Sequence, residues 1–272
     1  MANPIFRNSD TFNGRATPPQ ATYQQGAGHW GQPGVQGQPP QGYQQTQVSG
    51  GVMTLDDVIA KTAVTLLVVF ASAALTFMYL PQNLMFPALI GSALVGLVTV
   101  FLVAGRRSIP VGGVLFYAAV EGVFVGAFSK FFETMYPGIV FSAVLATFVA
   151  AGATLAAYKF FNIRVTQKFR KFVFIGTAAL AGVLLVNFVL ALAGVDTGLR
   201  GSGGDVGWLP ILVSVLAVGL AVFNLIIDFD FVERGVASQA PARESWRAAF
   251  GITVTMVWLY VEILRILSYF RN

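Results

Sequence analysis

Residues 211–228 read ILVSVLAVGLAVFNLIID, an apolar run that closes on the carboxylate of Asp228. A helix needs about 20 such residues to cross the hydrocarbon core of a bilayer, and this run has nearly that length. A carboxylate at membrane depth costs about 2.5–3.5 kcal/mol by insertion scales, unless it faces protein or water. The stretch therefore predicts a membrane-spanning helix and makes Asp228 a candidate functional residue.

Apolar segments of the same kind recur along the whole chain. Of its 272 residues, 56% are hydrophobic and only 11% are charged, whereas soluble domains carry about 25% charged residues. Backbone polar groups in lipid must be hydrogen-bonded within their own segment, which selects helices. The sequence predicts an all-α integral membrane protein with seven transmembrane helices, at about residues 58–80, 86–105, 110–132, 138–158, 171–194, 208–229 and 247–269.

The first 52 residues have a different composition, dominated by Gly, Gln, Pro and Tyr, as in GQPGVQGQPPQGYQQTQ. Such a segment buries too little apolar surface to offset the entropy lost on ordering. It also lacks the apolar region of a signal peptide. We expect a disordered cytoplasmic tail at residues 1–52, with its partner left open, and a membrane domain at residues 53–272 that begins at a helix cap, Thr54.

The reactive and charged residues exclude several classes of function. The chain has no Cys and a single His, His29, in the tail, which excludes thiolate sites and histidine-based catalytic centres. No Gly-rich phosphate loop or nucleophile–base pair is present, so we expect neither an enzyme nor a cofactor. The net charge of +5 does not indicate nucleic-acid binding, because the basic residues cluster in alternate connections. They lie in the tail and after the second, fourth and sixth segments, which predicts a cytoplasmic N-terminus and an external C-terminus.

A second acid, Asp230, follows Asp228 at the end of the same apolar run. Two residues apart on a helix, the side chains point about 200° away from one another, so only one is expected to face the interior. Asn224 lies four residues before Asp228 and shares its face, which favours Asp228 as the inward carboxylate. The alternative is that both acids simply mark the end of the helix.

Glu262 lies inside the last apolar segment, and Arg265 follows it one turn later. One interpretation is an ion pair within the helix between these two residues. The other is an inward carboxylate that meets Asp228 from the neighbouring helix. At about 4 Å and an effective dielectric of about 20, ionising both acids costs about 4 kcal/mol. Such a pair would share one proton and, when ionised, could bind Ca²⁺ transiently.

A third acid, Glu121, lies in the middle of the third apolar segment. It borders the face formed by Ala118, Gly122 and Gly126, a ladder of small residues that lets helices approach closely. Glu121 is therefore expected to point at protein. It either lines the same ion path as the other two acids or makes a buried structural hydrogen bond.

Three features together resemble one known family. They are the seven spans with short loops, the segment IIDFDFVERG at residues 226–235 and the segment LYVEILRIL at residues 259–267. Over about residues 54–270 the chain resembles the Bax inhibitor-1 family of transmembrane Bax-inhibitor-motif proteins. The start NPIFRNSDTF and the Gly/Gln/Tyr-rich tail are similar to an actinobacterial branch of that family.

The resemblance implies a fold and a set of roles. The family fold is a seven-helix bundle whose last helix is enclosed by the other six. The resemblance assigns Asp228 and Glu262 to a pH-sensing pair that gates a calcium leak, and it assigns Arg106 or Arg107 to locking the closed state. The family carries an aspartate at the position of Glu262, so a geometry tuned for two aspartates does not transfer unchanged.

These observations favour one function and leave two alternatives. The favoured function is a pH-sensitive cation (Ca²⁺) leak channel or ion-homeostasis protein of the bacterial inner membrane, with Ca²⁺, protons and the lipid bilayer as partners. The first alternative is a proton-coupled secondary transporter, although inverted repeats and broken helices are not evident. The second is a non-transporting regulatory or interaction protein that uses its tail as a contact surface.

Overall fold

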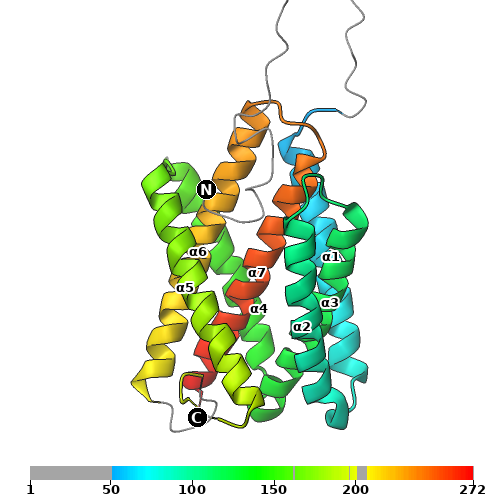
Figure 1. The fold of residues 1–272 in the computed structure, drawn as a ribbon, viewed down its shortest axis with the longest axis vertical. Coiled ribbons are helices and arrows are strands. Elements are labelled where there is room, and N and C mark those ends of the chain that lie inside the picture. Colours follow the sequence, from blue (N-terminus) through cyan, green and yellow to red (C-terminus); the bar gives the residue numbers. More distant parts are fainter. Residues whose placement is uncertain (1–50, 162, 196, 201–206, 272) are drawn as a thin grey trace, which may run out of the picture.

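The computed structural model describes residues 51–161, 163–195, 197–200 and 207–271, and over these residues the protein is built from helices without a β-strand (Figure 1). The predicted tail up to residue 50 lies outside the described residues. Seven helices are long and apolar enough to cross a membrane, as the sequence predicted. They are α1 (Leu55–Tyr79), α2 (Met85–Ala104), α3 (Val111–Met135), α4 (Ile139–Phe160), α5 (Gln167–Leu192), α6 (Trp208–Ala237) and α7 (Glu244–Tyr269), with a short 3₁₀ turn, η1 (Gln82–Leu84), before α2.

Successive helices run in opposite directions, because short connections join antiparallel neighbours. The N-terminal end of the bundle is the end at which α1, α3, α5 and α7 begin, and the C-terminal end is the end at which α7 finishes (Figure 1). The predicted cap of α1 is confirmed, since the Thr54 side chain accepts a hydrogen bond from the Asp57 amide at 3.2 Å. The largest difference between the predicted and the observed helix bounds is at the end of α6, which continues to Ala237.

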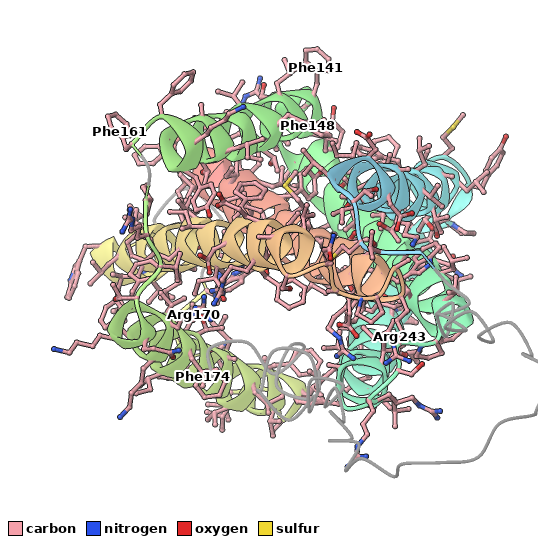
Figure 2. The ribbon with its side chains drawn as sticks, turned by 90° about the horizontal axis from the view of Figure 1, so that it is seen from above. Phe141, Phe148, Phe161, Arg170, Phe174 and Arg243 are labelled. Atoms are coloured by element: carbon pink, nitrogen blue, oxygen red, sulfur yellow. The ribbon has the colours of Figure 1, made fainter. Side chains whose placement is uncertain are left out.

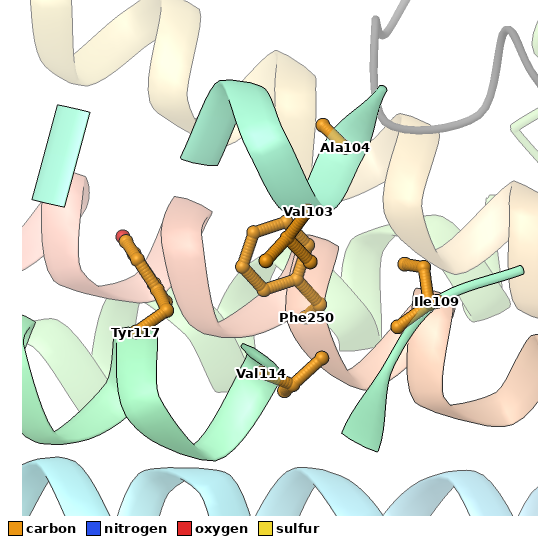
Figure 3. Packing of buried hydrophobic residues seen from close by; sticks show 6 residues of the cluster. All are labelled: Val103, Ala104, Ile109, Val114, Tyr117 and Phe250. Carbon is orange, nitrogen blue, oxygen red and sulfur yellow. The ribbon is translucent and has the colours of Figure 1, made fainter. Parts of the chain in front are cut away.

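The innermost helix is α7. It packs against α1, α3, α4 and α6, and its first turns reach α2 through a buried cluster that contains Phe250 of α7 and Val103 of α2 (Figure 3). In its most apolar stretch 56% of the residues are buried, against 6% for α5. The prediction that the other six helices enclose the last one is therefore confirmed for five of them. The exception is α5, which among the described helices packs only against α6.

The predicted small-residue ladder on α3 forms the tightest helix contact of the bundle. Gly122 and Gly126 lie directly against the backbone of α1, and a methyl group at either position would collide with the carbonyl oxygen of Val69 or Ala73. Ala118, on the same face, is fully buried. This close contact fixes α1 and α3 against each other beside α7.

The residues just before α1 belong to the folded domain. Met53 donates its amide to the Ala240 carbonyl at 2.7 Å, and Ala242 donates to the Gly51 carbonyl at 2.8 Å. Val52 and Pro241 form an isolated antiparallel bridge. Gly51 and Val52, which the sequence assigned to the tail, are thus paired with the α6–α7 connection.

Candidate functional site

Asp228 lies inside α6 and is 1% exposed. The Thr255 hydroxyl of α7 donates to its Oδ2 at 2.6 Å. The same hydroxyl oxygen lies 3.0 Å from the Gly251 carbonyl oxygen, one turn earlier on α7. We call Asp228, Thr255 and Gly251 the Asp228 site. In it, a buried carboxylate is matched with a neutral hydroxyl.

Glu262 lies on α7 nearer the C-terminal end and is 2% exposed. Its Oε2 accepts a hydrogen bond at 2.8 Å from Arg200, which belongs to the connection between α5 and α6. Arg265 lies close to both residues, and its guanidinium sits 5.4 Å from the centre of the Phe128 ring. We call Glu262, Arg200 and Arg265 the Glu262 site. Here one buried carboxylate forms an ion pair across elements with Arg200, and Arg265 on the same helix contributes a second positive charge within electrostatic range.

The structure does not bring Asp228 and Glu262 into contact, which corrects the predicted carboxylate pair. The residue of α7 opposite Asp228 is Thr255, and Glu262 lies seven residues further along. At 1.5 Å per residue this separation is about 10 Å along the helix axis. The physical reason is the register of α6 against α7. Because α6 continues to Ala237 before the chain turns, its acids lie opposite the middle of α7.

Asp230 is also buried, at 8% exposure. It accepts a hydrogen bond from Arg170 of α5 at 2.5 Å and forms a second ion pair with Arg234 on its own helix. Figure 2 shows Arg170 between the two helices. The prediction that only one of the two aspartates faces protein is therefore wrong, because α5 covers the far side of α6. The alternative that both acids simply mark a helix end is wrong too, since α6 continues beyond them.

The remaining polar residue predicted on α6, Asn224, connects helices. Its amide donates to Thr177 Oγ1 of α5 and to the Leu220 carbonyl, each at 2.8 Å. Asn224 is buried, as expected for a residue on the face of Asp228. Its contacts nevertheless attach α5 to α6 and do not reach the Asp228 site.

Glu121 faces α2. Its Oε2 lies 3.1 Å from the position that a Cβ atom on Gly96 would take, and Tyr117, one turn earlier, is its hydrogen-bonding neighbour. The Tyr117 ring packs edge-on against Phe250 of α7, with centroids 5.1 Å apart (Figure 3). Glu121 thus lies at the α2–α3 interface, apart from the two acids on α6 and α7.

Arg106 and Arg107, the candidates for locking the closed state, have exposed side chains in the α2–α3 connection. Their backbone carbonyls accept hydrogen bonds from Arg247, at 3.2 and 2.8 Å. Arg247 is 1% exposed and also donates to Glu244 at 2.9 Å. The cation that holds this connection against α7 is therefore Arg247, which was not among the functional residues predicted from the sequence.

Four further residues of these sites were missed from the sequence. Thr255 looked like an ordinary member of α7, and Arg247 was one of the basic residues that indicate topology, although an arginine beside an apolar run was a usable signal. Arg170 and Arg200 were counted only for topology, and Arg200 was distinctive as a lone cation in its connection. Within the described part of the chain no group of three or more His, Cys, Asp or Glu is arranged to hold a metal ion.

The fold and these sites define a class, a seven-helix integral membrane protein in which Asp228, Asp230 and Glu262 are each matched with a hydroxyl or a cation from a neighbouring element. The comparison with known families agrees with this class. The family model described as Bax inhibitor 1 like matches residues 3–272, and the chain belongs to that family. No curated protein matches the chain.

Proposed function

We propose that the protein is a pH-sensitive cation leak channel that passes Ca²⁺ across the bacterial inner membrane. The observation that carries the proposal is the burial of Asp228 and Glu262, at 1% and 2% exposure, within two adjacent membrane-spanning helices. Intramembrane carboxylates typically mark ion or proton paths. Membership of the family is compatible with this function. The proposed chemistry is non-enzymatic and needs no cofactor.

In this proposal the two acids act as successive stations about 10 Å apart along α7. With the N-terminus in the cytoplasm, as the basic residues predict, the Glu262 site is the outer station and the Asp228 site the inner one. A carboxylate oxygen is a suitable ligand for Ca²⁺. At the outer station, Arg200 forms an ion pair with the Glu262 carboxylate, with 2.8 Å between Nη1 and Oε2. The conformation with this ion pair is therefore the closed one, and conduction requires Arg200 to separate from Glu262.

The inner station accommodates both protonation states of Asp228. When Asp228 is ionised, Thr255 donates its proton to the carboxylate, across 2.6 Å. When Asp228 is protonated, it donates to the Thr255 oxygen, and the Thr255 proton turns to the Gly251 carbonyl, 3.0 Å away. A hydroxyl can donate once while it accepts, so both the added proton and the Thr255 proton have an acceptor. Only the ionised form attracts a cation.

Protonation acts differently at the outer station. A protonated Glu262 no longer forms an ion pair with Arg200, and Arg265 adds a second positive charge beside it. The pair is therefore weakened, and the connection that carries Arg200 is released. Flux consequently depends on pH through two acids, one that provides charge for the ion and one that holds the closing arginine.

The test is Ca²⁺ flux into liposomes at a series of pH values. The wild type is expected to change its flux with pH, and the double variant Asp228→Asn, Glu262→Gln is expected to flatten that dependence. Glu121→Gln is the matched control, because Glu121 is an acid within a span that faces α2. Equal flux at every pH in the wild type and the double variant would contradict the proposal, as would accumulation of Ca²⁺ against its gradient, which indicates a proton-coupled transporter.

A regulatory role is the second candidate, because the end of the tail is attached to the functional helices. Gly51 and Met53 hydrogen-bond to the connection between α6 and α7. A partner that pulls on the tail would act on both helices that carry the acids. Deleting residues 1–50 separates the candidates. Unchanged flux with a lost cellular phenotype would favour an interaction protein, and altered flux would make the tail a part of the channel.

A further inference from the structure

We propose that an acyl chain of a bilayer phospholipid binds in a cavity between α1 and α4, with α7 as its floor. The cavity has a volume of about 350 Å³, within the range of about 300–1,000 Å³ typical of ligand pockets. It lies in the half of the bundle toward the C-terminal end, between membrane-spanning segments. Neither Asp228 nor Glu262 lines it.

The walls of the cavity come from two helices whose backbones do not approach one another. Among the described helix pairs, α1 and α4 make no direct backbone contact, so the space between them is open to the side. Val69 and Ala73 of α1 face Val140 and Val144 of α4 across this space. The opening therefore leads out of the protein in the plane of the membrane.

One aromatic pair bridges the opening. The rings of Phe70 on α1 and Phe148 on α4 stack with centroids 6.0 Å apart and planes 11° from parallel. Figure 2 shows Phe148 on the side of α4 that faces α1. The two rings are 43% and 48% exposed, so they form part of the outer surface. A thin flexible chain can pass beside this pair, whereas a helix from a second protein is too wide.

The floor of the cavity has polar groups, but they are already hydrogen-bonded. Ser129 of α3 and Tyr260 of α7 share a hydrogen bond of 2.6 Å. Thr147 of α4 donates to the Ala143 carbonyl at 2.7 Å. Among the described lining residues there is no charged side chain. The cavity thus has no site for an ion or a strongly polar ligand, and its chemistry suits a hydrocarbon.

The position of the opening identifies the source of that hydrocarbon. Leu67 and Leu145, on α1 and α4 near the opening, are 65% and 50% exposed and belong to the surface that faces lipid. The cavity is continuous with this surface. Side chains that line an empty space lose their dispersion contacts on that side. Acyl chains surround the opening at high concentration. An acyl chain that enters the cavity restores the dispersion contacts of the side chains that line it.

The test uses a phospholipid with a photoreactive diazirine in one acyl chain. The probe is added in trace amount to phosphatidylethanolamine–phosphatidylglycerol liposomes that contain the full-length protein, and labelled peptides are mapped after irradiation. Met256, Val257 and Tyr260 of α7 are at most 8% exposed, so bulk lipid does not reach them. We expect label on this segment of α7 as well as on the outer faces of α1 and α4.

Two substitutions close the cavity from opposite walls. Val144→Trp fills it from α4, and Ala74→Trp fills it from α1 without removing a packed side chain. Each is expected to lower labelling of the α7 segment several-fold and to leave labelling of the outer face of α1 unchanged. Val149→Trp is the matched control, because Val149 is on α4 but is 70% exposed to lipid.

The outcomes are distinguishable even if one variant misfolds, because the thermal unfolding of each variant is measured beside its labelling. The proposal is overturned if the wild-type α7 segment carries no label. It is also overturned if a folded Val144→Trp or Ala74→Trp protein is labelled on α7 as strongly as the wild type. Absence of label on α7 in a protein that forms dimers through α1 and α4 would assign the opening to a second copy instead.

Discussion

The Asp228 site and the Glu262 site both contain one fully buried carboxylate, yet their partners differ in kind. Asp228 is matched with a neutral hydroxyl on the neighbouring helix. Glu262 forms an ion pair with Arg200, which comes from outside its helix, and Arg265 adds a second positive charge nearby. A hydroxyl can serve either protonation state of an acid, whereas an ion pair requires the charge. The comparison indicates that protonation has a local effect at the first site and is transmitted to another element at the second.

The two sites also differ in how their partners are held. Thr255 is fixed within the most enclosed helix of the bundle, where it shares its hydroxyl with Gly251. Arg200 belongs to a connection and reaches Glu262 only through its long side chain. A change at Glu262 can therefore move a segment of the chain, while a change at Asp228 reorients the Thr255 hydroxyl. Substitutions at the partner residues test this difference directly.

The largest effect is expected from Arg200→Met, which removes the cation from the Glu262 site. Removing one partner of a buried ion pair typically costs about 3–5 kcal/mol, because the other charge stays buried. We therefore expect a large loss of stability and a raised Ca²⁺ flux at neutral pH, since the closing arginine is gone. The measurements are unfolding in denaturing detergent and flux into liposomes. Combining the substitution with Glu262→Gln should recover part of the stability, and a flux equal to the wild type in Arg200→Met would contradict the closing role.

A smaller effect is expected from Thr255→Val, which removes the hydroxyl from the Asp228 site and keeps the shape of the side chain. A buried acceptor that loses its donor costs about 1–3 kcal/mol. Because the ionised form of Asp228 has lost its donor, flux should require a higher pH than in the wild type. Thr255→Ser restores the hydroxyl and should restore both properties. If Thr255→Val kept the wild-type pH profile, the hydroxyl would have no part in proton sensing.

Much of this arrangement could be predicted from the sequence, because membrane burial depends on local composition. The apolar runs predicted all seven helices, and the isolated acids within them predicted buried carboxylates. The partners could not be predicted in the same way. Arg170 and Arg200 lie 60 and 62 positions from the acids that they bind, and in the sequence both look like ordinary topology signals at or between the ends of predicted spans.

The predicted contact between Asp228 and Glu262 failed for a related reason. Each residue was placed correctly in the interior, but the pairing of antiparallel helices depends on where the first helix ends. Asp228 lies 9 residues before the end of α6, whereas Glu262 lies 18 residues after the start of α7. Residues at similar distances from the turn face one another in antiparallel helices, so Asp228 meets Thr255 and Glu262 lies about two turns beyond it.

The smallest effect on stability is expected from Asp228→Asn, and this substitution gives the sharpest contrast with the Glu262 site. The amide oxygen can accept the hydrogen bond from Thr255 as the carboxylate oxygen does, so we expect stability within about 1 kcal/mol of the wild type. The charge at the inner station is lost, and the flux should therefore fall at every pH in the liposome assay. Glu262→Gln is the matched comparison, because it leaves Arg200 without its carboxylate partner and should be clearly less stable. Equal stability losses in the two variants would show that the hydroxyl and the arginines hold their acids in the same way, and the distinction between a local and a transmitted response would be lost.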